Sequence, residues 1–443
     1  MISSLRLEAI SRQRIGVLGY GREGCSAVQA LREYAPDVDL TVLFESGEGP
    51  ADLPVLRGVF DEGLQDFDVL LRSPGVPVNH PALQAYRGKG GRIVNPGSIW
   101  FAERSDIPVI GVTGSKGKST TASLLAHLLA AQGKRVLLAG NIGVPLLDHL
   151  DTDAEIVVLE MSSYQLADIE GCLELGLITR LFPEHLDWHD TMAHYVSSKL
   201  RMACLLEGRP LLVNAADPVL MEATADIAGR IAANHSPFIE RHDDALFLGD
   251  ELLTESSRLS LIGRHNLDNM ALALQAGVLL GYPAGALAAS LADFKPLPHR
   301  LEPVATIDGV RWINDSIATS PYATLAALEA LGDGLVTLIV GGKDRRADWS
   351  EVIDWCGRKG LQGLVTLPDN GGLISEAFER ALGKGAVPQF PANDMETAVR
   401  QARSVSQSGS VVLLSPGAPS FPHFRDFEDR GHQFTNAVLA LKA

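Results

Sequence analysis

The chain has 443 residues, of which 46% are hydrophobic and 21% charged, and its formal net charge is −16. This length predicts about three domains of ordinary size, each able to bury its own core, and the composition excludes a disordered chain. The negative charge argues against binding nucleic acid or an anionic membrane through bulk electrostatics, so an anionic ligand must be held by local groups.

The cysteines and the apolar runs indicate the compartment. The four cysteines are scattered without C-x-x-C spacing, which predicts neither a disulfide framework nor a zinc site and favours a reducing cytoplasm. The first residues lack the charged and apolar regions of a signal peptide. No uncharged apolar run reaches the roughly eighteen residues of a membrane span, so no span is expected.

The first hundred residues alternate short predicted strands and helices. An apolar strand is predicted over residues 15–19, and Gly19, Gly21 and Gly24 form G-x-G-x-x-G before a helix rich in small and apolar residues. A second predicted strand ends next to Glu45, where a Rossmann unit keeps its ribose-binding acid. The pattern favours a nucleotide or another phosphate-bearing ligand. The alternative is a βαβ unit whose glycines serve close packing alone.

A further predicted strand, over residues 69–71, opens into a loop that begins with Ser73. In an open α/β sheet the loops that follow the strands form the ligand crevice. Gly19, Gly21 and Ser73 are therefore candidate substrate-binding residues.

A phosphate-binding loop is predicted within residues 107–129. An apolar strand enters the loop T-G-S-K-G-K-S at 113–119, a shorter form of G-x-x-x-x-G-K-[ST], and an amphipathic helix follows. The glycines let the backbone approach phosphate oxygens, Lys118 adds a mobile positive charge, and Ser119 offers a hydroxyl to magnesium. The alternative is an ordinary glycine-rich turn, but strand, loop and helix occur in the required order. The candidate nucleotide-binding residues of this loop are Gly114, Ser115, Gly117, Lys118, Ser119 and Thr120.

Three later positions bear on a metal site. The strand over residues 155–160 ends in Glu160, which we expect to hold magnesium with the phosphate loop rather than to be a solvated strand end. Two histidines and three acids follow a second buried strand, where they could form a metal cluster; His189 could equally belong to a plain helix start, so only His185 is predicted as a ligand. Lys199 lies on a predicted helix, and the residue pattern alone predicts a solvated lysine.

The return of apolar strand character beyond Ser105 and a proline-punctuated connection before residue 298 predict domains at residues 1–104, 105–297 and 298–443. The last domain repeats the alternation of strands and helices, and its polar or glycine-rich loops at 314–319 and 415–420, with a third at 341–345, are expected at the ligand edge of a parallel sheet.

Several separated motifs together resemble the Mur ligase family across almost the whole chain. They are T-G-S-K-G-K-S at 113–119, G-N-I-G at 140–143, L-E-M-S-S-Y-Q-L at 159–166, H-L-D at 185–187, S-K-L-R at 198–201, G-R-H-N at 263–266, P-H-R at 298–300 and N-D-S-x-A-T at 314–319. The chain is most similar to the branch that adds glutamate to UDP-N-acetylmuramoyl-L-alanine during peptidoglycan precursor synthesis. The resemblance implies an α/β chain of three domains: a Rossmann-like one for the UDP part, a central P-loop ATPase with a mostly parallel sheet, and a Rossmann-like one for the amino acid.

The resemblance also implies roles for individual residues. Lys118 and Ser119 would bind ATP phosphates and magnesium, Glu160 and His185 would hold the metal ions, and Lys199 falls at the lysine that the family carbamylates. The carbamate is an anion that can support a second magnesium ion. The residues expected to reach ATP are Asn269, Arg300 and Asp315. Those expected to line the UDP substrate and the phosphate side are Asn141, Ser162, Ser163 and Gln165.

The implied reaction is phosphoryl transfer from ATP to the terminal carboxylate of the substrate, followed by attack of the glutamate amine on the acyl phosphate. The cofactors are ATP and two magnesium ions, and the partners are UDP-N-acetylmuramoyl-L-alanine and glutamate. Clustered positive charge is needed because negative charge accumulates at one carbon. We expect a cytoplasmic monomer.

The glutamate pocket departs from the family pattern. The branch usually reads S-K-A-T where this chain has Ile317 between Ser316 and Ala318, and Lys343 and Arg345 both compete for the role of the lysine that binds the side-chain carboxylate. These departures look similar to a variant branch that adds L-glutamate, and we favour that branch over ordinary D-glutamate addition. The other candidate residues of this pocket are Thr319, Ser415 and Phe421.

Two other functions remain open from the sequence. A folylpolyglutamate-type ligase is another member of the superfamily, although such ligases lack the N-terminal Rossmann-like domain. A nucleotide-driven switch or transport ATPase, from a different class, uses the same kind of phosphate loop.

Overall fold

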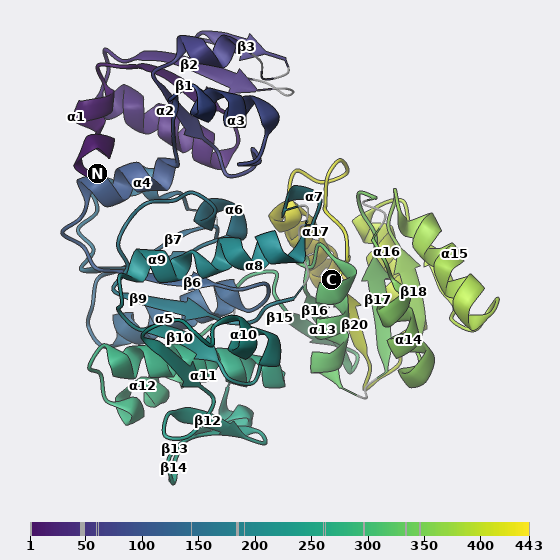
Figure 1. The fold of residues 1–443 in the computed structure, drawn as a ribbon. Helices are drawn as coiled ribbons and strands as arrows, with labels where there is room; N and C mark the ends of the chain where they lie inside the picture. Colours follow the sequence, from purple (N-terminus) through teal and green to yellow (C-terminus); the bar gives the residue numbers. More distant parts are fainter. Residues whose placement is uncertain are drawn as a thin grey trace. The chain divides into compact units, whose positions relative to one another are not determined.

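The computed structural model describes residues 2–44, 49–58, 60, 62–142, 144–182, 186–189, 191–259, 261, 263–295, 297–332, 335–344 and 347–442. The chain divides into two compact units, unit 1 being Met1–Arg258 with Asn266–Phe294 and unit 2 being Leu259–His265 with Lys295–Ala443. Three parallel or mostly parallel sheets follow one another along the chain, which confirms the predicted α/β class (Figure 1). The exact domain boundaries stay a prediction.

The first sheet of unit 1 has, among the described residues, five parallel strands in the order β3-β2-β1-β4-β5. Val17 of β1 pairs with Val42 on one side and Leu71 on the other, and all three side chains are buried because helices cover a parallel sheet on both faces. The strand order reverses at β1, so the loops after β1 and β4 border one crevice. The strands are β1 (Arg14–Leu18), β2 (Asp39–Phe44), β3 (Val55–Arg57), β4 (Val69–Arg72) and β5 (Arg92–Val94). The helices are η1 (Ile2–Leu5), α1 (Leu7–Ile10), α2 (Arg22–Tyr34), η2 (Glu62–Asp66), α3 (Pro81–Gly88) and α4 (Pro96–Glu103).

The second sheet of unit 1 is also parallel, and its described strands run β11-β10-β9-β6-β8-β7. Val112 of β6 pairs with Glu160 of β8 and with Leu177 of β9, so the loops after these three strands start at one edge. A small antiparallel sheet, β12-β13-β14, follows it along the chain. The strands are β6 (Val109–Thr113), β7 (Val136–Gly140), β8 (Ile156–Glu160), β9 (Leu175–Ile178), β10 (Leu211–Asn214), β11 (Arg230–Ala233), β12 (Ile239–His242), β13 (Ala245–Leu248) and β14 (Glu251–Glu255).

The helices of this part vary from one turn to more than four turns. The longest pack apolar side chains around most of their circumference; α5, for example, buries Leu124, Leu125, Leu128 and Leu129. No helix in the described ranges is long and apolar enough to cross a membrane. The helices are α5 (Lys118–Ala131), η3 (Leu146–His149), α6 (Ser163–Leu166), α7 (Leu186–His189), α8 (Met192–Leu200), α9 (Met202–Leu206), α10 (Pro218–Ala223), η4 (Ser256–Arg258), α11 (Arg264–Leu279), α12 (Ala284–Ser290) and η5 (Leu291–Asp293).

Unit 2 contains a sheet whose described strands run β15-β16-β20-β17-β18-β19. Among the described strands of this sheet, β15 alone is antiparallel to its neighbour, and Leu414 of β20 pairs with Asn314 of β16 and Ile339 of β17. The loops after these three strands therefore leave the sheet side by side at one edge. This agrees with the prediction that the loops at 314–319, 341–345 and 415–420 lie at one edge of a parallel sheet. The strands are β15 (Glu302–Ile307), β16 (Val310–Asn314), β17 (Val336–Val340), β18 (Gly363–Thr366), β19 (Gln389–Pro391) and β20 (Val411–Leu414). The helices are α13 (Pro321–Leu331), α14 (Ser350–Lys359), α15 (Gly371–Leu382), α16 (Met395–Val405) and α17 (Phe427–Ala440).

The two faces of α15 give a matched test of this packing. Phe378 is 1% exposed within the core of unit 2, whereas Leu373 on the same helix is 55% exposed. Phe378→Ala should lower the free energy of unfolding by about 3–5 kcal/mol, because it leaves a cavity that the sheet cannot fill. Leu373→Ala should change it by no more than about 0.5 kcal/mol. Urea unfolding followed by tryptophan fluorescence measures both, and equal effects would contradict this account of the core.

Candidate active site

The phosphate loop follows β6 and needs its two glycines. Gly114 has φ 146° and Gly117 has φ 87°, values that favour glycine, and Gly117 is also the N-cap of α5. A Cβ at Gly114 would collide with the side chain of Thr179, and one at Gly117 with the amide of Asn269. The structure therefore brings Asn269, predicted to reach ATP, against the loop.

The segment after β9 holds the loop in place. Ser115 N–H donates to Arg180 O at 2.6 Å, and Ser115 Oγ bonds Phe182 O at 2.9 Å and Tyr195 Oη at 2.7 Å. Ser115 thus shapes the loop in this conformation. Lys118 Nζ donates to Ser115 O at 2.7 Å, so the lysine is folded onto the loop it belongs to. The first turn of α5 continues with Ser119 and Thr120.

Glu160 ends β8 beside this loop and is 0% exposed. Asn141 Nδ2 donates to Glu160 Oε1 at 2.9 Å. No described residue donates a hydrogen bond to the other buried oxygen, Oε2. A buried carboxylate oxygen without a donor is costly unless a cation or water meets it, and oxygen is the ligand that magnesium prefers. The residues here fit the predicted metal site.

Lys199 lies on α8 and is 2% exposed. Its Nζ donates to Gly114 O at 2.8 Å and lies 4.7 Å from the ring centroid of Tyr195. The solvated lysine predicted from the residue pattern is therefore wrong, because α8 packs this face against the phosphate loop. Three predicted site residues, Lys118, Glu160 and Lys199, lie around the loop in the structure.

The predicted metal ligand His185 lies outside the described residues, as does Glu45. His189, left undecided by the sequence, is buried at the end of α7, and its Nε2 is 2.9 Å from Ser163 Oγ. The described residues contain no group of three or more His, Cys, Asp or Glu side chains that could hold a metal by themselves.

A pocket of about 330 Å³ lies in unit 1 between the loops after β1 and β4 and the segments after β7 and β8. It brings together all but one of the residues predicted to bind the UDP substrate. The exception is Ser163, whose hydroxyl contacts His189. The other lining residues were not predicted from the sequence, although Arg22, Glu23, Gly140 and Tyr164 lie within motifs quoted above and the rest follow the strand β4. The lining residues are Gly19, Gly21, Arg22, Glu23, Ser73, Pro74, Gly75, Val76, Gly140, Asn141, Ser162, Tyr164 and Gln165.

A capping box on α6 fixes two of the pocket residues. Ser162 Oγ accepts from Gln165 N, while Gln165 Oε1 accepts from Ser162 N at 2.9 Å. Gln165 Nε2 then donates to Glu23 Oε1 at 2.8 Å. Burial raises the pKa of Glu23, and this hydrogen bond opposes the rise.

The loops of unit 2 form a second candidate site. Ser415 Oγ donates to Asp315 Oδ2 at 2.8 Å, and Leu301 N–H donates to Asp315 Oδ1 at 3.1 Å. The loop after β20 is thereby joined to the loop after β16 and to the turn that contains Arg300. Both Ser415 and Asp315 are buried, so this pair fixes the loops.

The exposed residues of this edge include one predicted cation. Lys343 Nζ lies 5.4 Å from the ring centroid of Phe421, and the backbone N–H of Lys343 donates to Pro419 O at 2.9 Å. Thr319 is exposed on the loop after β16. The competing cation, Arg345, lies outside the described residues.

Arg430 on α17 was not found from the sequence, because a single arginine in an amphipathic helix carries no pattern. It is 0% exposed and donates to Ser316 Oγ, Ser316 O and Ala418 O at 2.8–3.0 Å. Burial lowers the pKa of its guanidinium, and the charge of Asp315 opposes this. Arg430 therefore ties the loop after β16 to the loop after β20.

Comparison with known proteins gives the family. Residues 112–277 match the Mur ligase middle domain and residues 299–417 the Mur ligase glutamate ligase domain. The chain is 39% identical to the UDP-N-acetylmuramoyl-L-alanine--L-glutamate ligase of Xanthomonas euvesicatoria pv. vesicatoria (strain 85-10), over 97% of this chain and 96% of that one. It is 38% identical to the enzyme of the same name from Micromonospora sp. (strain ATCC 39149 / NRRL 15099 / SCC 1413), over 98% of both chains.

The fold agrees with a solved structure. The crystal structure of UDP-N-acetylmuramate-alanine ligase MurC from Thermotoga maritima matches with a TM-score of 0.61 at 17% identity, covering 97% of this chain and all of that one. At this identity the likeness concerns the fold alone. The matched domains and the near full-length relatives, together with the phosphate loop, lead to one conclusion: the chain belongs to the Mur ligase family and is an ATP-dependent ligase.

Proposed function

We propose that this protein joins L-glutamate to UDP-N-acetylmuramoyl-L-alanine, with hydrolysis of ATP to ADP and phosphate, in the synthesis of peptidoglycan precursors. The observation that carries the proposal is the placement of Lys118, Glu160 and Lys199 around one phosphate loop in a chain whose near full-length relatives bear that name. The pocket between the loops after β1 and β4 supports a UDP-bearing substrate, since both loops lie at the strand-order reversal of a parallel sheet.

The phosphate loop and α5 would bind the ATP phosphates. The backbone at Gly114 and Gly117 and the N-terminus of α5 suit an anion, and Lys118 adds a charge that can leave Ser115 O for a phosphate oxygen. Ser119, Glu160, His185 and Lys199 would hold magnesium. The bound metal would neutralise charge on the phosphate oxygens.

The reaction needs two displacements. The terminal carboxylate of the UDP substrate attacks the γ-phosphorus of ATP, and ADP leaves with the electrons of the broken P–O bond. The glutamate amine then attacks the acyl carbon, loses a proton, and phosphate departs from the tetrahedral intermediate. Negative charge grows on oxygen in both steps, so a preorganised cation such as Lys118 lowers both barriers, and no side chain need act as nucleophile.

Lys199 would act as a carbamate. An ammonium close to magnesium is repelled, whereas the carbamate that forms when the neutral amine adds CO2 and loses a proton would present two oxygens that share one negative charge. The side chain is buried against Gly114 O, so it is held beside the loop where the phosphates bind. This position beside the loop supports a role for Lys199 in metal binding.

The preference for L-glutamate is supported by the relatives' names and by the loop after β16. Ile317 stands where the branch usually has lysine, so one anchor for a carboxylate is missing. Lys343 lies at the same edge over Phe421, and Arg345 offers a planar clamp two residues later. Anchors moved in this way present the amine of one enantiomer to the acyl carbon and misdirect the other.

The first prediction concerns ATP. Lys118→Ala should lower kcat by about a hundredfold or more, on the order of 3 kcal/mol in the barrier, because a preorganised cation is lost from phosphoryl transfer. ADP release is measured with UDP-N-acetylmuramoyl-L-alanine and L-glutamate. Lys134→Ala, which removes a half-exposed lysine just after α5, should turn over normally. Near-normal turnover of Lys118→Ala would contradict the assignment of this lysine to the ATP site.

The second prediction concerns the carbamate. Lys199→Ala should be nearly inactive, and formate or acetate should partly restore turnover by supplying an anion to the emptied site. Lys118→Ala serves as the control, because added carboxylates cannot replace a cation. The same ADP assay applies. Full activity of Lys199→Ala without added acid would contradict the proposed role.

The third prediction is stereochemical. The kcat/KM for L-glutamate should exceed that for D-glutamate by about tenfold or more, since a misplaced carboxylate leaves an unpaired charge in the pocket. Ile317→Lys should lower the ratio of kcat/KM for L-glutamate to kcat/KM for D-glutamate, because it restores a second cation that can bind a glutamate carboxylate. Initial rates with each enantiomer and saturating ATP decide the matter. A preference for D-glutamate would reject the L-specific proposal and leave the ligase assignment intact.

A further inference from the structure

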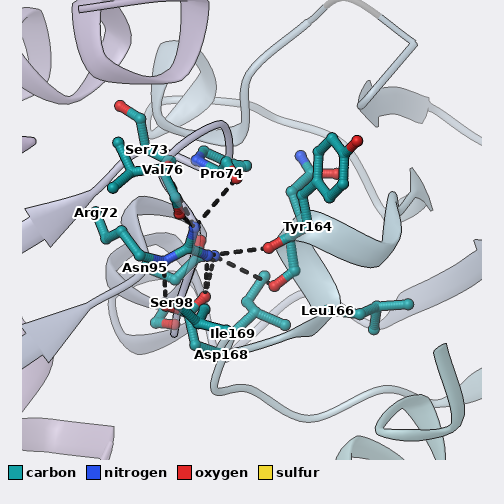
Figure 2. Close-up of polar contacts among 12 residues, drawn as sticks. Arg72, Ser73, Pro74, Val76, Asn95, Ser98, Tyr164, Leu166, Asp168 and Ile169 are labelled. Carbon is teal, nitrogen blue, oxygen red and sulfur yellow. Dashed lines mark hydrogen bonds and ion pairs between the residues drawn. The ribbon is translucent and has the colours of Figure 1, made fainter. Parts of the chain in front are cut away.

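A single buried cation, Arg72, lies behind the UDP-substrate pocket. It is the last residue of β4 and is 0% exposed. Figure 2 shows its guanidinium surrounded by oxygen atoms from the loop after β4 and from the segment around α6. We infer that Arg72 is a positioning residue that sets the shape of this pocket; the inference rests on the proposed function for the identity of the ligand.

The first wall of the pocket is wrapped around one nitrogen of Arg72. Nη1 donates to the carbonyl oxygens of Ser73 and Pro74 at 3.1 Å and to that of Val76 at 2.5 Å. These three residues line the pocket, and their carbonyls point toward the guanidinium (Figure 2). Ser73 Oγ also donates to Gly19 O at 2.8 Å, so the glycine loop after β1 is tied to the same arrangement.

The opposite wall is fixed by the other nitrogens. Nε and Nη2 donate to the two oxygens of Asp168, both at 2.6 Å, and Nη2 also donates to Tyr164 O at 2.9 Å. Tyr164 lines the pocket from α6. Asn95 Nδ2 donates to Asp168 Oδ1 at 2.9 Å and to Gln165 O at 3.3 Å, which joins a further pocket residue to the network.

The chemistry of the side chain explains why arginine stands here. Five N–H groups leave a planar guanidinium in fixed directions, and each has an acceptor in this network. A lysine can satisfy Asp168 or the loop carbonyls but cannot span both. A buried ion pair adds little net stability compared with apolar packing of the same volume, so stability alone is a weak reason for this arrangement. Its geometric effect is specific, because one rigid group spaces two walls that are about ninety residues apart in sequence.

Arg72 does not line the pocket, so its effect on the ligand must act through the walls. A preformed pocket loses less entropy when its ligand binds. Loosening both walls should therefore weaken binding of the UDP substrate while sparing the ATP site, whose loop is held by a separate set of bonds from Arg180, Phe182 and Tyr195. A purely structural role would instead lower the folded, active fraction, which reduces the apparent kcat and leaves both KM values unchanged.

The test is Arg72→Lys, with Arg104→Lys as the matched control. Arg104 likewise bonds one carboxylate, Asp106, and two carbonyls, those of Leu150 and Thr152, but it lies away from the pocket. Arg72→Lys should raise KM for UDP-N-acetylmuramoyl-L-alanine by about tenfold and leave kcat and KM for ATP within about twofold. Arg104→Lys should leave all three unchanged.

Hydrogen exchange gives a readout that needs no ligand. In Arg72→Lys, peptides covering residues 73–78 and 162–168 should exchange faster than in the wild type, while the peptide covering 113–119 should not. Asp168→Asn, which keeps an acceptor but removes the charge, should give the same pattern in weaker form and serves if Arg72→Lys does not fold. Unchanged KM and exchange, or equal changes in both arginine variants, would overturn the inference. An inactive wild type would instead refute the proposed function. Hydrogen exchange would then still test whether Arg72 holds the pocket walls, because that measurement needs no substrate.

Discussion

The pairing of β6 with β8 on one side and β9 on the other is the constraint on which the candidate active site depends. Parallel strands end at one edge, so this pairing delivers the phosphate loop, Glu160 and the segment after Ile178 to the same place. The loop then needs few contacts to become rigid: Ser115 bonds the segment after β9, and Lys199 bonds Gly114 O. The geometry of the site follows from sheet register before any ligand is considered.

Two loops in the described part of the chain are held by a buried arginine. Arg72 and Arg430 are each 0% exposed, and each donates to backbone carbonyls of a loop that we propose to bind an anionic ligand. The net charge of −16 repels anionic ligands at a distance. A positive charge close to a loop therefore also helps that loop to attract such a ligand.

The features that could be predicted from the sequence are those that depend on short runs of neighbouring residues. The α/β class, the strand that enters the phosphate loop and the loops of unit 2 follow from apolar runs that end in glycine or polar residues, and these agree with the structure. Lys199 shows where such reasoning fails, since its burial depends on how α8 packs against Gly114, which helical spacing does not encode. Arg72 and Arg430 were missed for the same reason. Their partners are mainly backbone carbonyls, which every residue possesses, so no combination of residue types marks them.

The segment from Glu160 to Gln165 links the two chemical tasks of unit 1. Glu160, whose Oε2 has no hydrogen-bond donor among the described residues, is proposed to hold magnesium, while Ser162 and Gln165, two and five residues later, line the pocket proposed for the UDP substrate. The capping box on α6 makes this stretch stiff, and Asn141 contacts Glu160 while also lining the pocket. A substrate seated against α6 is therefore placed relative to the phosphate loop by a few short, hydrogen-bonded residues. Phosphoryl transfer needs its reacting atoms aligned within a fraction of an ångström, and a short rigid connection meets that need better than two independently mobile loops.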